Sequence, residues 1–305
     1  MAIGIDWGGT SIKGAVVDGA NVRASSSVDT RVDAGPACVL DDIAALVKQL
    51  DARPESVGVA IPGEVRDDGR CWRLPNVPGF EDVNIAAELQ KRLGCPIGVE
   101  NDATTAALAE RLYGWGNTYR SFLLVTLGTG IGGGVVLDGH VRRGANGFAG
   151  EIGHVLVNST EDAWPCACGK RGCMEAYAGT AGLLRRYGEL KGSDPVSGTE
   201  TGSDPLPATI KQIAEAGGEA AEEVWKQLGE ALGTGLAQIN NVLDLDAIIF
   251  TGGVSGSFEK VKPHVRKAMQ ARAFAPPLAE LPLQVSKLGI QAGTIGAAHL
   301  PAGGR

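Results

Sequence analysis

Two stretches of this chain repeat one local pattern: an apolar strand, a glycine-rich turn and a second strand. The first covers residues 3–17, and the second covers residues 122–137. A short glycine turn between two apolar strands is typical of a hairpin. Strands and helices alternate after each of these stretches, which is typical of an α/β fold. We therefore predict α/β architecture with mixed sheets, and the repeated opening hints at a duplicated domain.

The rest of the chain is read from hydrophobic periodicity and turn residues. A polar stretch at residues 114–121 predicts a boundary between domains 1–115 and 116–290, and the Gly/Pro/Ser-rich residues 192–207 predict a loop. The predicted strands are 3–6, 12–17, 22–28, 57–61, 97–100, 122–127, 132–137 and 247–250. The predicted helices are 41–50, 83–93, 103–113, 208–216, 219–242 and 291–300.

Composition excludes several classes of function. The chain has 305 residues, a net charge of −7 and no basic block, which argues against a nucleic-acid partner. No apolar run reaches the roughly 18 residues of a membrane span, and the N-terminus lacks the features of a signal peptide. We therefore expect a cytoplasmic protein with no membrane partner. In that compartment Cys38, Cys71 and Cys95 are expected to be buried or neutral thiols.

Three further cysteines form a cluster. Cys166, Cys168 and Cys173 lie within eight residues, and His154 lies twelve residues before the first of them. Three thiols and an imidazole at this spacing suit one tetrahedral structural Zn²⁺. The carboxylates of Glu151 and Glu175 flank the cluster, so a metal there would fix a loop that carries both.

Glycine-rich turns follow three apolar strands, at residues 6–10, 126–133 and 251–254. Glycines let backbone N–H groups approach an anion closely, so three such turns favour a nucleotide. Lys13 can add a positive charge, the hydroxyls of Thr10 and Thr129 can add donors, and Asp6 can hold Mg²⁺ through water.

Residues 128–133 also satisfy the pattern G-x-G-x-x-G. That dinucleotide-binding pattern requires a helix after the turn, whereas a strand is predicted here, so we reject it. The P-loop pattern is absent from the sequence.

Asp102 is the candidate acid–base residue. It lies beside Asn101, where a buried strand meets a helix. A helix N-cap would explain an acid at this position, and Asn101 could supply that cap instead. A carboxylate at the carboxyl end of a strand can also accept the proton of a hydroxyl that attacks a phosphate.

Five motifs together resemble the ROK family of sugar kinases and repressors, and most closely its bacterial glucokinases. They are Asp6-x-Gly-Gly-Thr-x-x-Lys13, Glu100-Asn-Asp102, the run 127–134, Glu151-x-Gly-His154 and Cys166-x-Cys-Gly-x-x-Gly-Cys173-x-Glu175. The resemblance implies an actin-like, hexokinase-like (ribonuclease H-like) fold of two α/β domains around a central cleft. It implies transfer of phosphate from ATP to a hexose, normally at the 6-hydroxyl, with glucose preferred. It also implies that the last helix, about 291–305, packs on the N-terminal domain.

The resemblance assigns roles to individual residues. It implies that Asp102 is the catalytic base, and that ATP and Mg²⁺ are cofactors beside a structural Zn²⁺. The implied sugar-binding residues are Gly63, Asn76, Asn101, Asp102, Glu151, His154 and Glu175. The implied nucleotide-binding residues are Asp6, Gly8, Gly9, Thr10, Lys13, Thr129, Gly130, Gly132, Gly133, Gly252, Gly253 and Val254. The implied zinc ligands are His154, Cys166, Cys168 and Cys173.

The sequence departs from the family pattern at two aromatic positions and leaves several alternatives open. Trp7 stands where smaller apolar residues are commoner, and Phe80 stands where the family often has Trp. The sugar could be N-acetylmannosamine, N-acetylglucosamine, fructose, allose or mannose, and the donor could be polyphosphate. A sugar-responsive repressor would need a DNA-binding segment before the first strand, for which we see no room. The resemblance suggests a homodimer or homotetramer.

Overall fold

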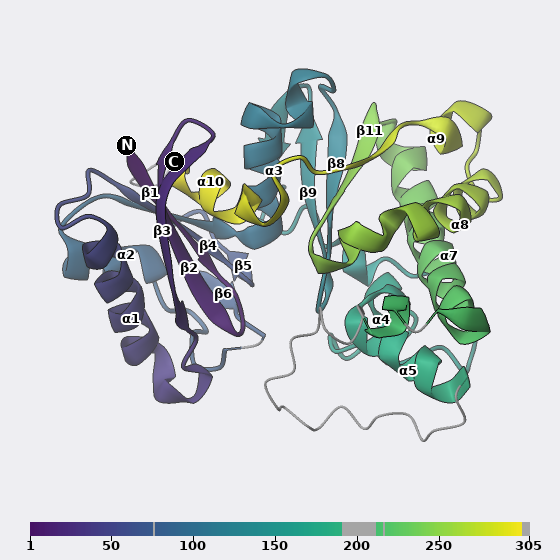
Figure 1. Ribbon diagram of the computed structural model, residues 1–305, viewed down its shortest axis with the longest axis horizontal. Helices are drawn as coiled ribbons and strands as arrows, with labels where there is room; N and C mark the ends of the chain where they lie inside the picture. The colour runs from purple at the N-terminus through teal and green to yellow at the C-terminus, as the bar shows by residue number, and fades with distance from the viewer. Residues whose placement is uncertain (76, 191–211, 216, 301–305) are drawn as a thin grey trace. The chain divides into compact units, whose positions relative to one another are not determined.

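The computed structural model describes residues 1–75, 77–190, 212–215 and 217–300 (Figure 1). The chain groups into two compact units. One comprises Met1–Arg120, Gly134–Gly150 and the residues from Lys287 onward, and the other comprises Ser121–Gly133 and Glu151–Ser286. The chain enters the first unit three times, so no single boundary in the sequence can separate the two units. The boundary between domains 1–115 and 116–290 therefore stays a prediction.

The first unit contains a five-stranded sheet with the order β3-β2-β1-β4-β7. Strands β1 (Ala2–Trp7), β2 (Ser11–Asp18) and β3 (Asn21–Asp29) are antiparallel neighbours, and β4 (Val57–Ile61) and β7 (Ile97–Asn101) continue parallel to β1. All five residues of β4 are buried, as expected for a parallel strand covered on both faces. The predicted strands 3–6, 12–17, 22–28, 57–61 and 97–100 are therefore confirmed.

A row of glycines lets one helix lie directly on this sheet. Gly4, Gly58 and Gly98 are in register across β1, β4 and β7. A Cβ on Gly58 would lie 1.7 Å from the carbonyl oxygen of Ala297 in α10 (Ala292–Ala298). No side chain fits between the two backbones, so α10 packs against β1 and β4 (Figure 1). The glycines therefore place the last helix beside the first strand.

The opposite face of the sheet is covered by α1 (Gly35–Leu50), and α2 (Ile85–Leu93) packs beside α1. Alternate residues of a strand face opposite sides, and Gly14 pairs with Ile5, the neighbour of Gly4. Accordingly, a Cβ on Gly14 would lie 2.7 Å from Leu50 and 3.2 Å from Leu46 of α1.

The prediction that α1 begins at residue 41 was wrong by six residues. Pro36 lies in the first turn, where its fixed φ favours a helix start, and the added turns bury Val39 and Leu40.

Two shorter segments connect this core to the candidate site. A hairpin of β5 (Glu64–Val65) and β6 (Cys71–Arg73) follows β4, and α3 (Asp102–Tyr113) begins where β7 ends. Helix α3 packs against α10. The hairpin was not predicted because its strands are too short to show alternation.

The second sheet has the order β10-β9-β8-β11-β12. Its strands are β8 (Phe122–Leu127), β9 (Ile131–Leu137), β10 (His140–Arg142), β11 (Ala247–Thr251) and β12 (Leu283–Val285). As in the first sheet, the opening strands are neighbours joined by short turns, and the later strands add parallel to β8. The repeated pattern in the sequence thus corresponds to a repeated sheet topology.

The second unit also contains several helices. They are α4 (Met174–Ala178), α5 (Thr180–Leu190), α7 (Gly218–Leu243), α8 (Phe258–Gln270) and α9 (Pro276–Glu280). Helix α7 matches the predicted helix 219–242 within one residue at each end. The predicted loop 192–207 lies outside the described residues, as does most of the predicted helix 208–216. Within the described part of the chain, no helix is both long and apolar enough to cross a bilayer.

Candidate active site

The junction of β7 and α3 orients Asp102 by hydrogen bonds within the chain. The side-chain oxygen of Asn101 accepts the N–H of Thr104 at 3.0 Å, so Asn101 is the N-cap of α3. The Oδ1 atom of Asp102 accepts the Ala103 N–H at 2.7 Å and the Asn101 Nδ2–H at 3.1 Å. Capping is therefore the role of Asn101, and the carboxylate of Asp102 is held in a defined orientation beside it.

Gly63 lies against the same junction. Its carbonyl oxygen accepts a hydrogen bond from Asn101 Nδ2 at 3.2 Å. A Cβ on Gly63 would lie 2.3 Å from the carbonyl oxygen of Arg73, so the position admits only glycine without a backbone shift. The structure thus brings together three of the predicted sugar-binding residues, Gly63, Asn101 and Asp102, while Asn76 lies outside the described residues.

The first glycine turn joins β1 to β2. Asp6 faces Lys13 across this hairpin, and burial raises the pKa of the Asp6 carboxyl while Lys13 opposes that rise. The N–H of Gly8 donates to the Ser11 carbonyl at 2.9 Å, and Gly9 and Thr10 form the bend. The hairpin thus holds a carboxylate and an ammonium group at the same end of the sheet.

The two aromatic departures from the family pattern are neighbours in the structure. Trp7 and Phe80 are both fully buried, and their rings meet edge to face with centroids 4.9 Å apart. The two residues are 73 positions apart, so the sequence does not link them. Only the folded chain brings their rings into contact.

The second glycine turn, between β8 and β9, is bonded to the start of α4 and α5. Glu175 Oε2 accepts the Ile131 N–H at 2.9 Å, and the Thr180 hydroxyl donates to the Gly128 carbonyl at 2.7 Å. A Cβ on Gly130 would lie 2.3 Å from Glu175 Oε2. Thr129, Gly130, Gly132 and Gly133 belong to this turn and to the first residues of β9. The strand that follows supports the rejection of a dinucleotide-binding motif.

The third glycine turn lies beside the second. Gly252, at the end of β11, has a φ of 97°, and a Cβ there would lie 2.4 Å from the Leu127 carbonyl oxygen. Only glycine permits both the conformation and this approach. Gly253 and Val254 begin the short helix η4 (Gly253–Ser257). Two of the three predicted nucleotide turns are thus adjacent within one unit.

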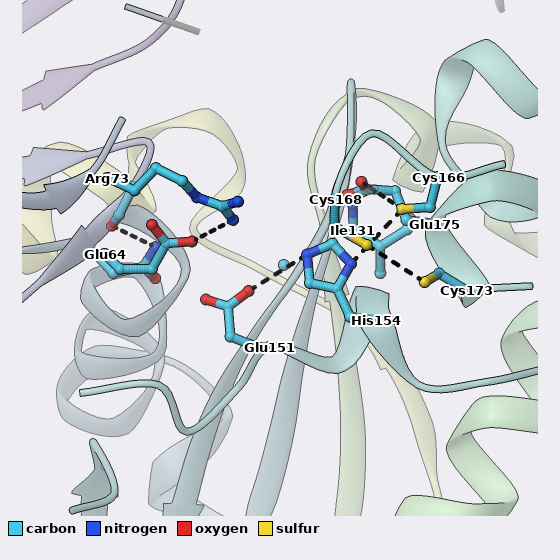
Figure 2. A network of polar contacts seen from close by, with 12 residues as sticks. Glu64, Arg73, Ile131, Glu151, His154, Cys166, Cys168, Cys173 and Glu175 are labelled. Carbon is cyan, nitrogen blue, oxygen red and sulfur yellow. Dashed lines mark hydrogen bonds and ion pairs between the residues drawn. The ribbon is translucent and has the colours of Figure 1, made fainter. Parts of the chain in front are cut away.

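Four metal-ligating side chains converge as predicted: His154, Cys166, Cys168 and Cys173 offer donor atoms that all lie within 4.8 Å of one another. The Sγ atoms of Cys168 and Cys173 are 3.7 Å apart, and Cys166 Sγ is 3.8 Å from His154 Nδ1 (Figure 2). A tetrahedral zinc–thiolate site with bonds of about 2.3 Å has edges of about 3.8 Å, so the donor set fits Zn²⁺.

Two carboxylates lie next to the cluster, Glu151 beside His154 and Glu175 beside Cys166. His154 Nε2 lies 3.8 Å from Glu151 Oε2, so this imidazole has one nitrogen near the thiols and the other near a carboxylate. Cys166 Sγ lies 3.9 Å from Glu175 Oε1, and Oε2 of the same carboxylate bonds to the second glycine turn (Figure 2). Glu175 therefore links the cysteine cluster to that turn. Burial raises the pKa of Cys166 to about 12, so a bound metal would have to displace its proton.

Three side chains that support these groups were not singled out in the sequence. Thr180 holds the second turn, and Arg73 lies 3.1 Å from Glu64 Oε1, next to Gly63 (Figure 2). Arg143 contacts the motif residue Glu100. A threonine at a helix start or an arginine before a glycine-rich loop is common, so local sequence carries no signal that separates them from surface residues.

Known proteins resemble this chain along its whole length. A family model described as "ROK family" matches residues 2–303. A glucokinase of Halalkalibacterium halodurans is 32% identical, with 98% of this chain and 94% of the relative covered. An N-acetyl-D-glucosamine kinase of Pasteurella multocida is 30% identical, with 98% and 99% covered.

Among solved structures, a ROK family glucokinase from Streptomyces griseus in complex with glucose and AMPPNP has a TM-score of 0.82 and 29% identity, with 97% of each chain covered. The predicted fold class, an actin-like and hexokinase-like α/β fold of two domains, is therefore confirmed. With its five motifs in order, its repeated sheets and a family match over nearly every residue, the chain belongs to the ROK family.

Proposed function

We propose that this chain is an ATP-dependent sugar kinase that phosphorylates the 6-hydroxyl of a hexose, with glucose as the preferred substrate. The observation that carries the proposal is the orientation of Asp102 at the β7–α3 junction, where Oδ1 accepts two hydrogen bonds from the chain. A carboxylate held in this way is suited to accept the proton of a hydroxyl as that oxygen attacks phosphorus. Asp102 is the proposed catalytic base.

The glycine turns are the proposed phosphate-binding and nucleotide-binding elements. Phosphoryl transfer asks a protein mainly for positioning and neutralisation of charge. The adjacent second and third turns offer backbone N–H groups, and Asp6 and Lys13 lie in the first hairpin. Burial favours the protonated form of Asp6, and a nearby divalent cation would stabilise its ionised form instead. Asp6 therefore fits Mg²⁺ held through water. Bound there, Mg²⁺ would neutralise phosphate charge.

Six further residues are the proposed sugar ligands: Gly63, Asn76, Asn101, Glu151, His154 and Glu175. Carboxylates, amides and an imidazole can pair with the several hydroxyls of a hexose. His154 joins this set to the thiols, and a Zn²⁺ held by His154, Cys166, Cys168 and Cys173 would fix the loop that carries it. We assign that zinc a structural role because four protein ligands complete its coordination.

The glucokinases among the relatives support glucose as the preferred substrate of this chain. A kinase for N-acetylated hexosamines is the second candidate. The N-acetyl-D-glucosamine kinase of Pasteurella multocida supports that candidate, because it is nearly as similar to this chain as the glucokinase relatives are. ATP is the proposed donor rather than polyphosphate, since the similar glucokinase from Streptomyces griseus was solved in complex with AMPPNP. A cytoplasmic homodimer or homotetramer is the proposed state of the protein.

A coupled assay for ADP across glucose, mannose, fructose, allose, N-acetylglucosamine and N-acetylmannosamine tests the function. We expect the highest kcat/KM with glucose, and no sugar-dependent ADP with any of them would refute the proposal. Asp102→Asn should lower kcat by roughly 10²-fold or more, which is the size of general-base terms. Asp18→Asn is the matched control, because Asp18 lies on the surface in an exposed ion pair with Arg23 and should retain full turnover.

A further inference from the structure

A buried ion pair lies directly behind the strand end that carries Asp102. Arg143 and Glu100 have side chains only 8% and 9% exposed, and Arg143 Nε lies 2.5 Å from Glu100 Oε2. The Nε–H bond does not point along this contact, so it is an ion pair more than a directed hydrogen bond. Two opposite charges at this depth constrain the position of the backbone that bears them.

The two carboxylate oxygens of Glu100 have different partners. Oε2 faces Arg143, whereas Oε1 accepts the backbone N–H of Asn101 at 2.9 Å. Asn101 in turn donates through Nδ2 to Asp102 Oδ1 and to the Gly63 carbonyl. A continuous series of polar contacts therefore runs from Arg143 through Glu100 and Asn101 to the carboxylate of Asp102.

Arg143 makes three contacts, two with the β5–β6 hairpin and one with β7. One terminal nitrogen, Nη2, donates to the Val65 carbonyl in β5 at 2.8 Å, and the other, Nη1, contacts Asp67 in the loop that follows β5. The third contact is Glu100 in β7. The planar guanidinium presents these donors in a fixed fork, which a lysine cannot reproduce. The hairpin next to Gly63 and the strand that ends at Asn101 are thus fixed relative to each other by one side chain.

Side-chain packing leaves open space on one side of this strand end. Glu100 and Arg143 line a cavity of about 160 Å³ whose other walls include Gly98, Thr104, Leu108 and Val141. With open space beside β7, the ion pair supplies a restraint that side-chain packing does not. A buried ion pair seldom adds much net stability, because desolvation offsets the attraction, so its main effect here is on geometry.

We propose that Arg143 and Glu100 are positioning residues that set the orientation of Asp102 for the attack of the sugar hydroxyl. This inference rests on the proposed function, because it takes Asp102 as the base. It goes further by assigning roles to two residues that do not touch the reacting atoms. Without the pair, the Glu100 side chain that accepts the Asn101 N–H would no longer be fixed in place. The carboxylate of Asp102 would then sample several orientations.

The test compares Glu100→Gln, the neutral double variant Glu100→Gln/Arg143→Gln, and the control Asp67→Asn. The single variant leaves Arg143 buried without its main counter-charge, which can destabilise the fold, whereas the double variant removes both charges. Asp67 contacts the same guanidinium but is 76% exposed, so its loss should have little effect. For each folded variant, kcat and KM are measured with the preferred sugar and ATP, sugar affinity is measured by calorimetry, and the melting temperature is recorded.

We expect kcat to fall at least about 10-fold in the single and double variants, since a displacement of about 1 Å can cost up to 10²-fold. Sugar affinity should fall less than kcat does, and Asp67→Asn should match wild type, if these residues act mainly on the base. A wild-type protein without turnover on the sugar panel rejects the proposed function, and the inference falls with it. Wild-type turnover together with unchanged kcat in the folded double variant overturns the inference alone.

Discussion

Replacing Gly293 by alanine should damage nucleotide use while leaving the fold intact. Gly293 lies in α10 against the carboxylate of Asp6, and a Cβ there would lie 2.6 Å from both Cγ and Oδ2 of Asp6. Ordinary contacts begin at 3.4 Å, so the neighbour must move by about 3.4 − 2.6 = 0.8 Å. The backbone of α10 is already pressed onto Gly4 and Gly58, so the Asp6 side chain is the part that can give way.

The stability terms for this substitution nearly cancel. Moving Asp6 off its preferred rotamer costs about 0.5–1.5 kcal/mol. Alanine is more favourable than glycine inside a helix by about 0.8–1.0 kcal/mol. The net change in unfolding free energy should therefore lie within about 1 kcal/mol, which corresponds to a shift in melting temperature of no more than about 4 °C for a unit of this size. Without the clash, the substitution would stabilise the protein.

Catalysis should respond far more strongly than stability. A displacement near 1 Å of a group proposed to position the metal-bound phosphates can cost up to about 10²-fold, so we expect kcat/KM for MgATP to fall about 10- to 100-fold. Steady-state kinetics with varied MgATP and saturating sugar measure this, and KM for the sugar serves as the internal control. Wild-type MgATP kinetics in a folded Gly293→Ala protein would refute the role given to Asp6.

The cysteine cluster and the buried thiols give two further predictions. Protein purified without added metal should contain about one zinc per chain by elemental analysis. Cys168→Ser should lose the zinc and raise KM for the sugar, because the loop with His154 and Glu175 would loosen. Full sugar affinity in a zinc-free variant would contradict this. Cys71 is fully buried and burial raises its pKa to about 12, so only about 10⁻⁴ of it is thiolate at pH 8, and a thiol reagent should modify it in the unfolded protein alone. Prompt modification of native Cys71, detected by mass spectrometry, would show that this part of the core opens.

Local pattern was sufficient for the elements whose signal is local. Runs such as 57–61 and 122–127 are apolar, end at turn residues and became β4 and β8. The cysteine cluster was also predictable, because three of its four ligands lie within eight residues and chain geometry alone brings them close. The start of α1 was missed because Gly35 and Pro36 resemble a turn until the burial of Val39 and Leu40 is known.

Contacts between distant segments were not predictable in this way. The aromatic pair of Trp7 and Phe80, and the series from Arg143 to Asp102, join residues that no periodicity connects. The same holds for the approach of Gly252 to Leu127, which places two glycine turns side by side.

The sequence by itself therefore determined the identity of the chemical groups: the family's motifs, the thiol cluster, the glycine turns and the acid at the end of a strand. Only the tertiary structure decided how those groups are held, including which residue caps α3 and which buried charge supports Asp102. The physical reason is range. Hydrogen bonding and hydrophobic periodicity along one strand or helix act over a few residues, whereas orientation depends on backbones packed together from opposite ends of the chain, as in the contact of Gly58 with Ala297.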